Sequence, residues 1–259
     1  MRTSEIVGQI REHTLLKRDL DCHSIVIDLG MNDGRFAREI HDKYGCRVIG
    51  VEPNPRLAMS FAGSDIITCH NMAISSSEGI VKFRIDDDSE ASHIISDDAV
   101  TQGQTVVDVP SVSLRTFLVR NDIARVDLLK MDIEGAELAI FEGDDFNVLP
   151  QMKQISVEFH AFLNVSQRPR VKEIISRMTK NGFYCMDFSA TWKDVLFLNQ
   201  AMMPLSRRDK IALSYRKYAL GFPALFEKIH REGLGAVTRK IISRRYASAA
   251  AGGRGRTPR

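Results

Sequence analysis

Short apolar runs alternate with amphipathic stretches along the first 200 residues. Seven compact runs are typical of buried strands, at residues 24–29, 47–51, 65–69, 126–131, 154–159, 183–188 and 194–198. Apolar residues recur at helical spacing between them, at residues 34–44, 54–61, 136–141 and 171–178. Strands that alternate with helices form β-α-β units. The pattern therefore predicts an α/β fold with a mostly parallel seven-stranded sheet and helices on both of its faces.

Two further strands are predicted at residues 79–85 and 105–109, on either side of a long polar segment. That segment, residues 86–104, is acidic and has no helical or strand period. Long loops inside compact domains are more often functional than idle. We expect residues 86–104 to form a lid or to contact a substrate, and a solvated insertion remains an equal alternative.

Charge divides the 259-residue chain, although its net charge is only +3. Residues 201–259 hold 14 Lys or Arg and 3 Asp or Glu, whereas residues 1–200 hold 22 basic and 30 acidic residues. An acidic body followed by a basic extension indicates a domain boundary near residue 200. We predict four parts: a helical lead-in at 1–21, a main domain at 22–200, a basic helical extension at 201–247 and a disordered tail at 248–259.

The basic extension, residues 201–247, carries apolar residues roughly at helical spacing, with Lys and Arg around them. Such a segment can lie on an anionic membrane surface, pack on a partner protein, or fold back on the acidic body. The last of these is slightly favoured.

The four cysteines are scattered without a C-x-x-C pair, which favours buried free thiols in a reducing compartment. The N-terminus lacks the apolar segment of a secretory signal, and no apolar run approaches the roughly 18 residues that span a bilayer. We expect a cytoplasmic protein, with peripheral membrane attachment left open.

The first β-α connection is rich in glycine. It reads Asp28-Leu29-Gly30-Met31-Asn32-Asp33-Gly34 and leads into a predicted helix. Its glycines allow a tight turn and a close approach of a ligand to the backbone, and the helix start favours an anionic group. Asn32 stands where the dinucleotide motif G-x-G-x-x-G needs its second glycine, so an NAD site is disfavoured. Asp28, Gly30, Asn32 and Gly34 are candidate cofactor-binding residues, and a purely structural turn is the alternative.

Glu52 ends the second predicted strand, 18 residues after Gly34. An acidic residue at about this distance from the glycine loop is placed to bind a ribose diol. Loop, helix start and acid together suit S-adenosylmethionine, with its amino-acid part over the loop and its ribose at Glu52. Adenine needs an apolar slot with a polar contact. We expect that slot after the third strand, where the candidates are His70, Asn71, Met72 and Ala73.

The run Lys130-Met131-Asp132-Ile133-Glu134-Gly135-Ala136-Glu137 follows the fourth predicted strand. Together with the glycine loop and Glu52-Pro53-Asn54, it resembles the FkbM-type methyltransferases over about residues 22–200. One departure is Ser113-Leu114-Arg115, where the family commonly has Thr-Leu-Asp. The resemblance implies a Rossmann-like class I methyltransferase domain that uses S-adenosylmethionine, mostly on hydroxyl oxygens. It further implies an acceptor hydroxyl on a sugar of a glycan or glycolipid, or on a secondary metabolite.

Three carboxylates lie in this short run. Asp132 leaves the strand end, and we expect it to face the amino group of the donor or the acceptor. Glu134 and Glu137 lie next to a predicted helix start, where carboxylates can satisfy free N–H groups. Capping is at least an even alternative to a catalytic role for both glutamates.

Glu158 and His160 are two residues apart near the end of the fifth predicted strand, which would place them on one face. A hydroxyl is a poor nucleophile until its proton leaves, and a histidine oriented by a carboxylate is a suitable base. We predict that His160 takes the proton and that Glu158 or Asp132 orients it. A packed strand histidine is the main alternative. Two carboxylates and a histidine can also hold Mg²⁺ or Mn²⁺, but we expect no metal.

Two rival functions remain. The basic extension could bind nucleic acid, which would indicate a nucleic-acid methyltransferase. The acidic body and the absence of a [DN]-P-P-[YFW] motif make this the weaker hypothesis. A non-catalytic scaffold with the same fold is the other alternative, and Gly30, Gly34 and Glu52 argue against it.

Overall fold

The computed structural model describes residues 6–76, 78–86, 92–95, 105–162, 165–189 and 191–218. The chain forms two compact units, Met1–Lys217 and Tyr218–Arg259. Tyr218 is the only residue of the second unit among those described. The predicted disordered tail and most of the basic extension, residues 219–259, therefore lie outside the described residues.

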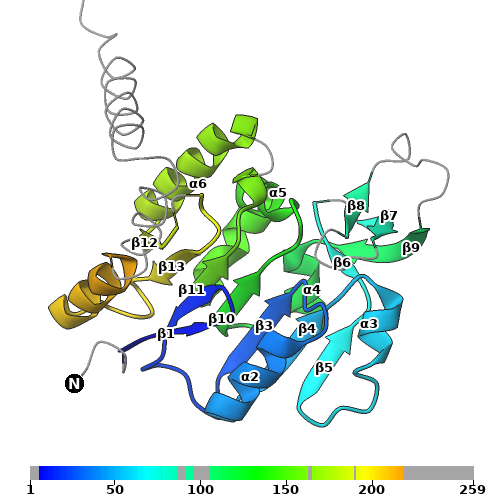
Figure 1. Cartoon of the computed structure of the whole chain (residues 1–259), viewed down its shortest axis with the longest axis horizontal. Helices are drawn as coiled ribbons and strands as arrows, with labels where there is room; N and C mark the ends of the chain where they lie inside the picture. The colour runs from blue at the N-terminus through cyan, green and yellow to red at the C-terminus, as the bar shows by residue number, and fades with distance from the viewer. Residues whose placement is uncertain are drawn as a thin grey trace, which may run out of the picture. The chain divides into compact units, whose positions relative to one another are not determined.

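A seven-stranded sheet forms the centre of the first unit, in the order β12-β13-β11-β10-β3-β4-β5 (Figure 1). β13 runs opposite to the other six strands, which all share one direction, so the predicted mostly parallel sheet is confirmed. The strands span Ile25–Leu29 (β3), Arg47–Val51 (β4), Ile67–His70 (β5), Val126–Met131 (β10), Met152–Val157 (β11), Phe183–Asp187 (β12) and Val195–Asn199 (β13).

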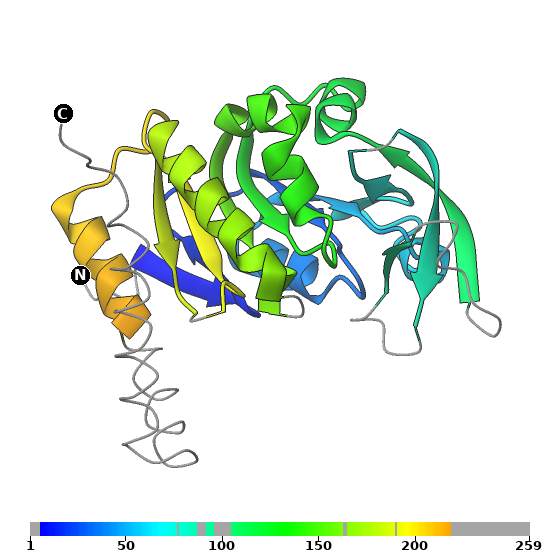
Figure 2. The ribbon, with the colours of Figure 1, turned by 90° about the horizontal axis from the view of Figure 1, so that it is seen from above.

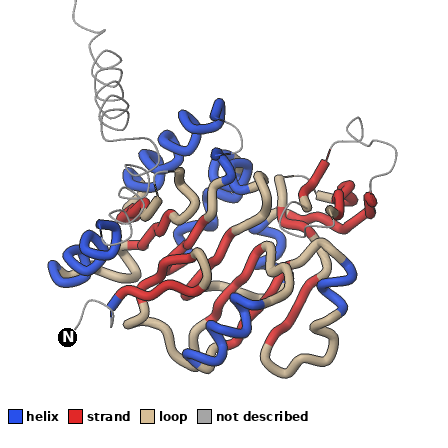
Figure 3. Tube along the Cα trace, in the orientation of Figure 1, coloured by secondary structure: helices blue, strands red, loops and turns tan. Residues whose placement is uncertain are grey.

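Helices cover both faces of this sheet, as Figures 2 and 3 show. On one face, α2 (Arg35–Tyr44) buries Phe36, Ala37 and Ile40 against strand residues such as Val26. On the other face, a larger apolar cluster joins the sheet to the remaining helices. Those helices are α4 (Leu114–Arg120), α5 (Glu137–Glu142) and α6 (Arg168–Lys180), together with the 3-10 helix η3 (Asp144–Gln151). Alternate strand residues thus supply two separate cores.

A second, four-stranded sheet follows β5 and the short helix α3 (Pro55–Met59), in the order β6-β9-β7-β8. It consists of β6 (Ala73–Ile74), β7 (Gly79–Ile85), β8 (His93–Ile95) and β9 (Thr105–Val112). The strands predicted at 79–85 and 105–109 pair antiparallel in it. The sequence pattern did not indicate that they form a sheet of their own, nor did it predict β6, β8 or α4.

The N-terminal segment is a β-hairpin of β1 (Val7–Ile10) and β2 (His13–Leu16). The predicted helical lead-in at 1–21 is therefore wrong for residues 7–16. Long-range polar contacts hold the hairpin on the sheet. The backbone of Leu16 exchanges two hydrogen bonds with the Gln154 side chain, and the Asp194 carboxylate accepts from the backbone and hydroxyl of Thr14. Local periodicity contains no information about such partners.

Residues 207–218 are helical and follow β13. This helix buries Ala212 and Leu213, and Asp209 pairs with Arg18. Residues 201–217, which the charge pattern assigns to the extension, thus pack in the same compact unit as the sheet. No helix in the described part of the chain is both long and apolar enough to cross a membrane. All four cysteines are free, but of the predicted buried thiols Cys46 alone is fully buried, since Cys69 and Cys185 are partly buried and Cys22 is exposed.

Candidate active site

A pocket lies beside the carboxyl ends of β3, β4 and β10, where ligands of parallel sheets bind. It holds about 590 Å³ of empty space, including the part that opens to solvent. Its walls come from both sheets, since Phe83 and Ile94 of the small sheet, and Ser92 just before β8, line it with residues of the large one. Ser92 and Ile94 belong to the predicted lid, residues 86–104, of which the structure describes only 86 and 92–95.

The glycine loop forms the floor of this pocket. Gly30 has a φ of 73°, and a Cβ there would lie 1.8 Å from the backbone oxygen of Asp132. No side chain fits, so the loop can follow this path only with glycine. Gly34, with a φ of 72°, is the N-cap of α2, and Asn32 lines the pocket with a φ of 51°. The predicted loop residues therefore lie where a ligand can approach the backbone.

Glu52 lines the pocket at the end of β4 and is only 5% exposed. Its two carboxylate oxygens accept hydrogen bonds from the backbone N–H groups of Asn32 (2.7 Å) and Asn54 (2.8 Å). Burial raises the pKa of Glu52, and these two hydrogen bonds oppose the rise. Each carboxylate oxygen has a second lone pair. Glu52 can therefore hold the loop and still accept from ribose hydroxyls.

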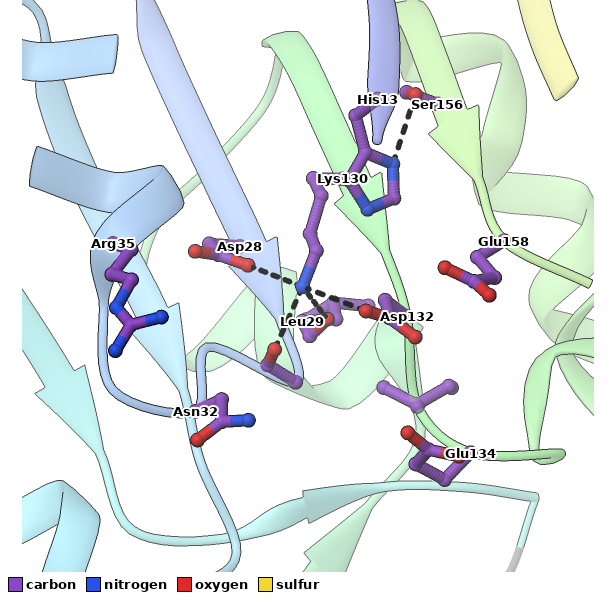
Figure 4. A network of polar contacts seen from close by, with 12 residues as sticks. His13, Asp28, Leu29, Asn32, Arg35, Lys130, Asp132, Glu134, Ser156 and Glu158 are labelled. Carbon is purple, nitrogen blue, oxygen red and sulfur yellow. Dashed lines mark hydrogen bonds and ion pairs between the residues drawn. The ribbon is translucent and has the colours of Figure 1, made fainter. Parts of the chain in front are cut away.

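Lys130 links the glycine loop to the strand end, as Figure 4 shows. Its ammonium lies 3.0 Å from Oδ1 of Asp28 and 3.7 Å from Oδ2 of Asp132, and donates to the backbone oxygen of Gly30 at 2.7 Å. Burial alone would lower the pKa of Lys130, but the charges of Asp28 and Asp132 raise it. Asp28 is fully buried and is not among the pocket residues, so its visible role is to hold Lys130.

His160 does not lie on β11, which ends at Val157, but begins a short 3-10 helix, η4 (His160–Phe162). The expected shared strand face with Glu158 is therefore wrong. Nδ1 of His160 lies 2.9 Å from Oε1 of Glu137, and Nε2 lies 3.1 Å from Oε2 of Glu134 and 3.6 Å from Oδ1 of Asp132. Glu137 is thus the carboxylate that orients His160, in place of the predicted Glu158 or Asp132. Glu158 instead forms an ion pair with Lys193, at 3.4 Å.

Glu137 also organises the turn before α5. It is 1% exposed and accepts hydrogen bonds from the backbone N–H groups of Ile133 and Gly135. This agrees with the capping alternative for Glu137, although the helix begins at Glu137 rather than at residue 136. Glu134, with a φ of 53°, instead turns its carboxylate to His160.

Asp132, Glu134 and His160 form an acidic cluster with unusual protonation equilibria. Burial would lower the pKa of His160, but the hydrogen bond and charge of Glu137, with the charges of Glu134 and Asp132, raise it to about 9. Burial, together with neighbouring carboxylates, raises the pKa values of Glu134 and Glu158 to about 7. Burial also favours a higher pKa for Asp132, but the charges of Lys130, His13 and His160 lower it. His160 is therefore protonated at neutral pH in the free chain, and it cannot act as a base until that proton leaves.

Of the four candidates for an adenine contact, Ala73 lines the pocket. His70 packs edge-on against Phe117, and Met72 packs against the apolar core. Asn71 donates hydrogen bonds to the backbone oxygens of Glu52 and Pro53, and so supports the part of the pocket wall that these two residues form. The apolar wall itself includes residues that the sequence analysis did not single out: Val51, Leu57, Ile74, Phe83, Ile94 and Ile133.

Comparison with known protein families shows to which family the chain belongs. The Methyltransferase FkbM domain matches residues 28–185, which include the glycine loop, Glu52 and the whole carboxylate run. The chain belongs to the FkbM methyltransferase family. This FkbM methyltransferase uses S-adenosylmethionine, as expected from the sequence. No curated protein gives a match.

Solved structures of other methyltransferases are similar to this FkbM protein at low identity. An RNA methyltransferase from Salinibacter ruber is 12% identical, over 69% of this chain and 81% of that one, with a TM-score of 0.34. A precorrin-6y C5,15-methyltransferase from Geobacter metallireducens GS-15 is 10% identical, over 69% and 82%, with a TM-score of 0.37. A geranyl diphosphate C-methyltransferase from Streptomyces coelicolor A3(2) is 10% identical, over 77% and 70%, with a TM-score of 0.35. Scores this low say nothing about the acceptor of this chain.

The pocket fits the methyl donor of the family. Gly30 and Asn32 bring the backbone of the loop to the pocket, Glu52 offers lone pairs for a ribose, and Ala73 and Leu57 contribute an apolar wall. When bound, S-adenosylmethionine supplies a methyl group on a positively charged sulfur. Asp132 and Glu134 line the same pocket and belong to the acidic cluster. The chain therefore combines a pocket that suits the donor with acidic side chains at its edge.

Proposed function

We propose that this FkbM protein is an O-methyltransferase that acts on a hydroxyl of a sugar in a glycan or glycolipid, or on that of a secondary metabolite. One observation carries the proposal. Two carboxylates, Asp132 and Glu134, line the donor pocket while facing Nε2 of His160 at 3.6 Å and 3.1 Å. Carboxylates accept hydrogen bonds from hydroxyl groups and take up their protons.

The residues of the cluster would divide the work of binding and deprotonating the acceptor. Asp132 and Glu134 bind the hydroxyl at the pocket edge, and Glu137 keeps His160 in place beside them. The hydroxyl proton passes to the cluster while the oxygen forms its new bond to the methyl carbon and the carbon–sulfur bond breaks. Positioning and exclusion of water supply much of the acceleration in such a transfer. Glu137 and His160 are buried, and this burial favours both the positioning of the acceptor and the exclusion of water.

A nucleic-acid methyltransferase is the alternative, which the basic extension supports through its charge. The acidic cluster disfavours it, because the carboxylates at the pocket edge would repel a phosphate backbone. The cytoplasmic location is likewise a proposal. So is contact of residues 201–247 with an anionic membrane surface or a partner protein, since residues 219–247 lie outside the described part of the chain.

Methyl-labelled S-adenosylmethionine tests the proposal with three acceptor pools: a panel of methyl glycosides, a glycolipid extract and total RNA. We expect label in a carbohydrate pool. Asp132→Asn should lower turnover by about 10²–10⁴-fold, the range of general acid–base effects, while S-adenosylhomocysteine affinity changes only a few-fold. Glu142→Gln, a surface change at the far end of α5, serves as the control.

Two outcomes would contradict the proposal. Label that enters RNA alone would favour the nucleic-acid alternative. Unchanged turnover in Asp132→Asn would remove the acidic cluster from the chemistry.

A further inference from the structure

The acidic cluster has the composition and spacing of a metal site. One ligand atom from each of Asp132, Glu134 and His160 lies within 4.8 Å of the other two. Asp132 and Glu134 follow the end of β10, as Figure 4 shows, and His160 follows the adjacent strand β11. We propose that these three side chains bind a divalent cation of the Mn²⁺ type at the edge of the donor pocket. This departs from our expectation of no metal, which considered Glu158 in place of Glu134.

The histidine is oriented as metal-binding histidines are. The Glu137 carboxylate accepts a hydrogen bond from Nδ1 of His160. It also accepts from the backbone N–H groups of Ile133 and Gly135, so it remains an acceptor in this position. Glu137 therefore holds the proton on Nδ1, so the proton that a cation would replace is the one on Nε2, which faces the two carboxylates. Histidines that bind metals usually donate their other N–H to a carboxylate or carbonyl in this way.

Asp132 presents one oxygen to each of two neighbours. Its Oδ2 faces the Lys130 ammonium at 3.7 Å, and its Oδ1 faces Nε2 of His160 at 3.6 Å. The lysine thus fixes the carboxylate with Oδ1 on the cluster side. Glu134 approaches the same nitrogen from the following turn. One Nε2–H can serve the two carboxylates only in a shared hydrogen bond, whereas a cation between the three ligand atoms contacts all of them.

The ligand chemistry selects the type of cation. Two carboxylates and one imidazole form a mixed oxygen and nitrogen set, which suits Mn²⁺ better than Mg²⁺ or Ca²⁺, whose sites are built from oxygen. Three protein ligands leave coordination positions for other oxygens. Because Asp132 and Glu134 line the pocket, those positions face the space where an acceptor would bind.

The catalytic role of the cation rests on the proposed function. A hydroxyl that binds the cation loses its proton more readily, because the positive charge stabilises the alkoxide. The proton leaves to a nearby carboxylate, and Glu158, which follows β11, is a candidate for that group. The cation would also fix the oxygen in line with the methyl group of the donor.

Binding of Mn²⁺ to the full chain, without donor or acceptor, tests the site directly. Electron paramagnetic resonance should show one bound Mn²⁺ per chain and, in pulsed mode, coupling to one ¹⁴N nucleus. His160→Gln should remove that coupling, and both His160→Gln and Glu134→Gln should weaken binding by at least about 10–100-fold, the loss seen even for outer-shell changes. Glu142→Gln removes a similar charge away from the cluster and should bind like the wild type.

Three results would overturn the site: no bound Mn²⁺, equal binding by the wild type and both cluster variants, or bound Mn²⁺ without nitrogen coupling. Circular dichroism checks that each variant folds. If His160→Gln does not fold, Glu134→Gln decides alone, because that side chain is 23% exposed and its ion pair is with His160 at the cluster edge.

Methyl transfer with and without a chelator separates the site from the proposed function. Transfer to sugar hydroxyls that stops with the chelator and returns with Mn²⁺ supports both. Transfer by a chain that binds no Mn²⁺ overturns the metal and leaves the proposed function standing. Bound Mn²⁺ with transfer to RNA alone supports the site and overturns the proposed function.

Discussion

Glu137 and His160 are joined by a hydrogen bond of 2.9 Å between two buried side chains that are 23 residues apart. One follows β10 and the other follows β11, so this contact ties together the ends of two neighbouring strands. Glu137 also accepts from the backbone of the turn that carries Glu134. A single carboxylate therefore sets both the orientation of the imidazole and the shape of the turn beside the pocket.

Glu137→Gln tests this double role. The amide nitrogen of Gln would face an N–H donor that the carboxylate now satisfies, and a buried unsatisfied donor costs about 1–3 kcal/mol. We expect the free energy of unfolding in urea to fall by that amount. Turnover should fall more than S-adenosylhomocysteine affinity, because Glu52 and the glycine loop are untouched. Glu142→Gln, at the other end of α5, is the matched control. Turnover that falls only in proportion to the folded fraction would reduce Glu137 to a structural residue.

The sequence predicted the elements that carry the glycine loop and Glu52, because each combines a local apolar run with a recognisable turn. Gly30, Asn32 and Glu52 accordingly lie at the pocket where we expected a donor site. The motif around Lys130 pointed to the right family and to the right strand end. These features depend on residues that are close together in the chain, where periodicity and turn chemistry are informative.

The geometry of the acidic cluster could not be predicted in the same way. The partner that orients His160 depends on where β11 ends. The predicted strand ended two residues too late, so Glu158 was expected as the partner where the structure has Glu137. The N-terminal hairpin depends on contacts with Gln154 and Asp194, more than 130 residues away. The small sheet closes the pocket through non-local pairing of β7 with β9. Single-sequence patterns do not encode such partners.

Gly30→Ala should be among the most destabilising changes at the site. The new Cβ would need a left-handed conformation and would overlap the backbone oxygen of Asp132. Backbone strain and overpacking together cost about 3–5 kcal/mol. Gly63→Ala is the control, because Gly63 has a similar φ of 79° but nothing within 4 Å of the new Cβ. It should cost only the strain, about 1–2 kcal/mol. Equal midpoints of urea unfolding for the two variants would mean that the loop moves freely away from β10.

Lys130→Met would remove the ammonium that lies near both Asp28 and Asp132, and leave the two carboxylates without their cation. Breaking a buried ion pair from one side costs about 3–5 kcal/mol, and we expect a loss of that size in urea unfolding. The double variant Asp28→Asn/Lys130→Met removes a buried charge as well. It should therefore be more stable than Lys130→Met alone, although it has one more substitution. Additive losses in the double variant would show that Asp28 and Lys130 do not interact in solution.

His13 should make the folded chain sensitive to acid. It is 2% exposed and bonded to the Ser156 hydroxyl, and burial, followed by the charge of Lys130, lowers its pKa from 6.5 to about 3. Between these values the unfolded chain binds a proton that the folded chain excludes. The contribution of neutral His13 is therefore complete above about pH 6.5 and is lost as the pH falls towards 3, with a slope of up to about 1.4 kcal/mol per pH unit.

Urea unfolding of the wild type and of His13→Asn at several pH values between 7 and 4 measures that slope. Asn retains a short polar group towards Ser156 but does not titrate, so the variant should lose stability less steeply than the wild type as the pH falls. His23→Asn, at an exposed position, should leave the slope unchanged. If the wild type and His13→Asn lose stability in parallel, His13 either takes up its proton in the folded chain or is not buried in solution. The β1–β2 hairpin would then pack less tightly on the sheet than its contacts with Gln154 and Asp194 indicate.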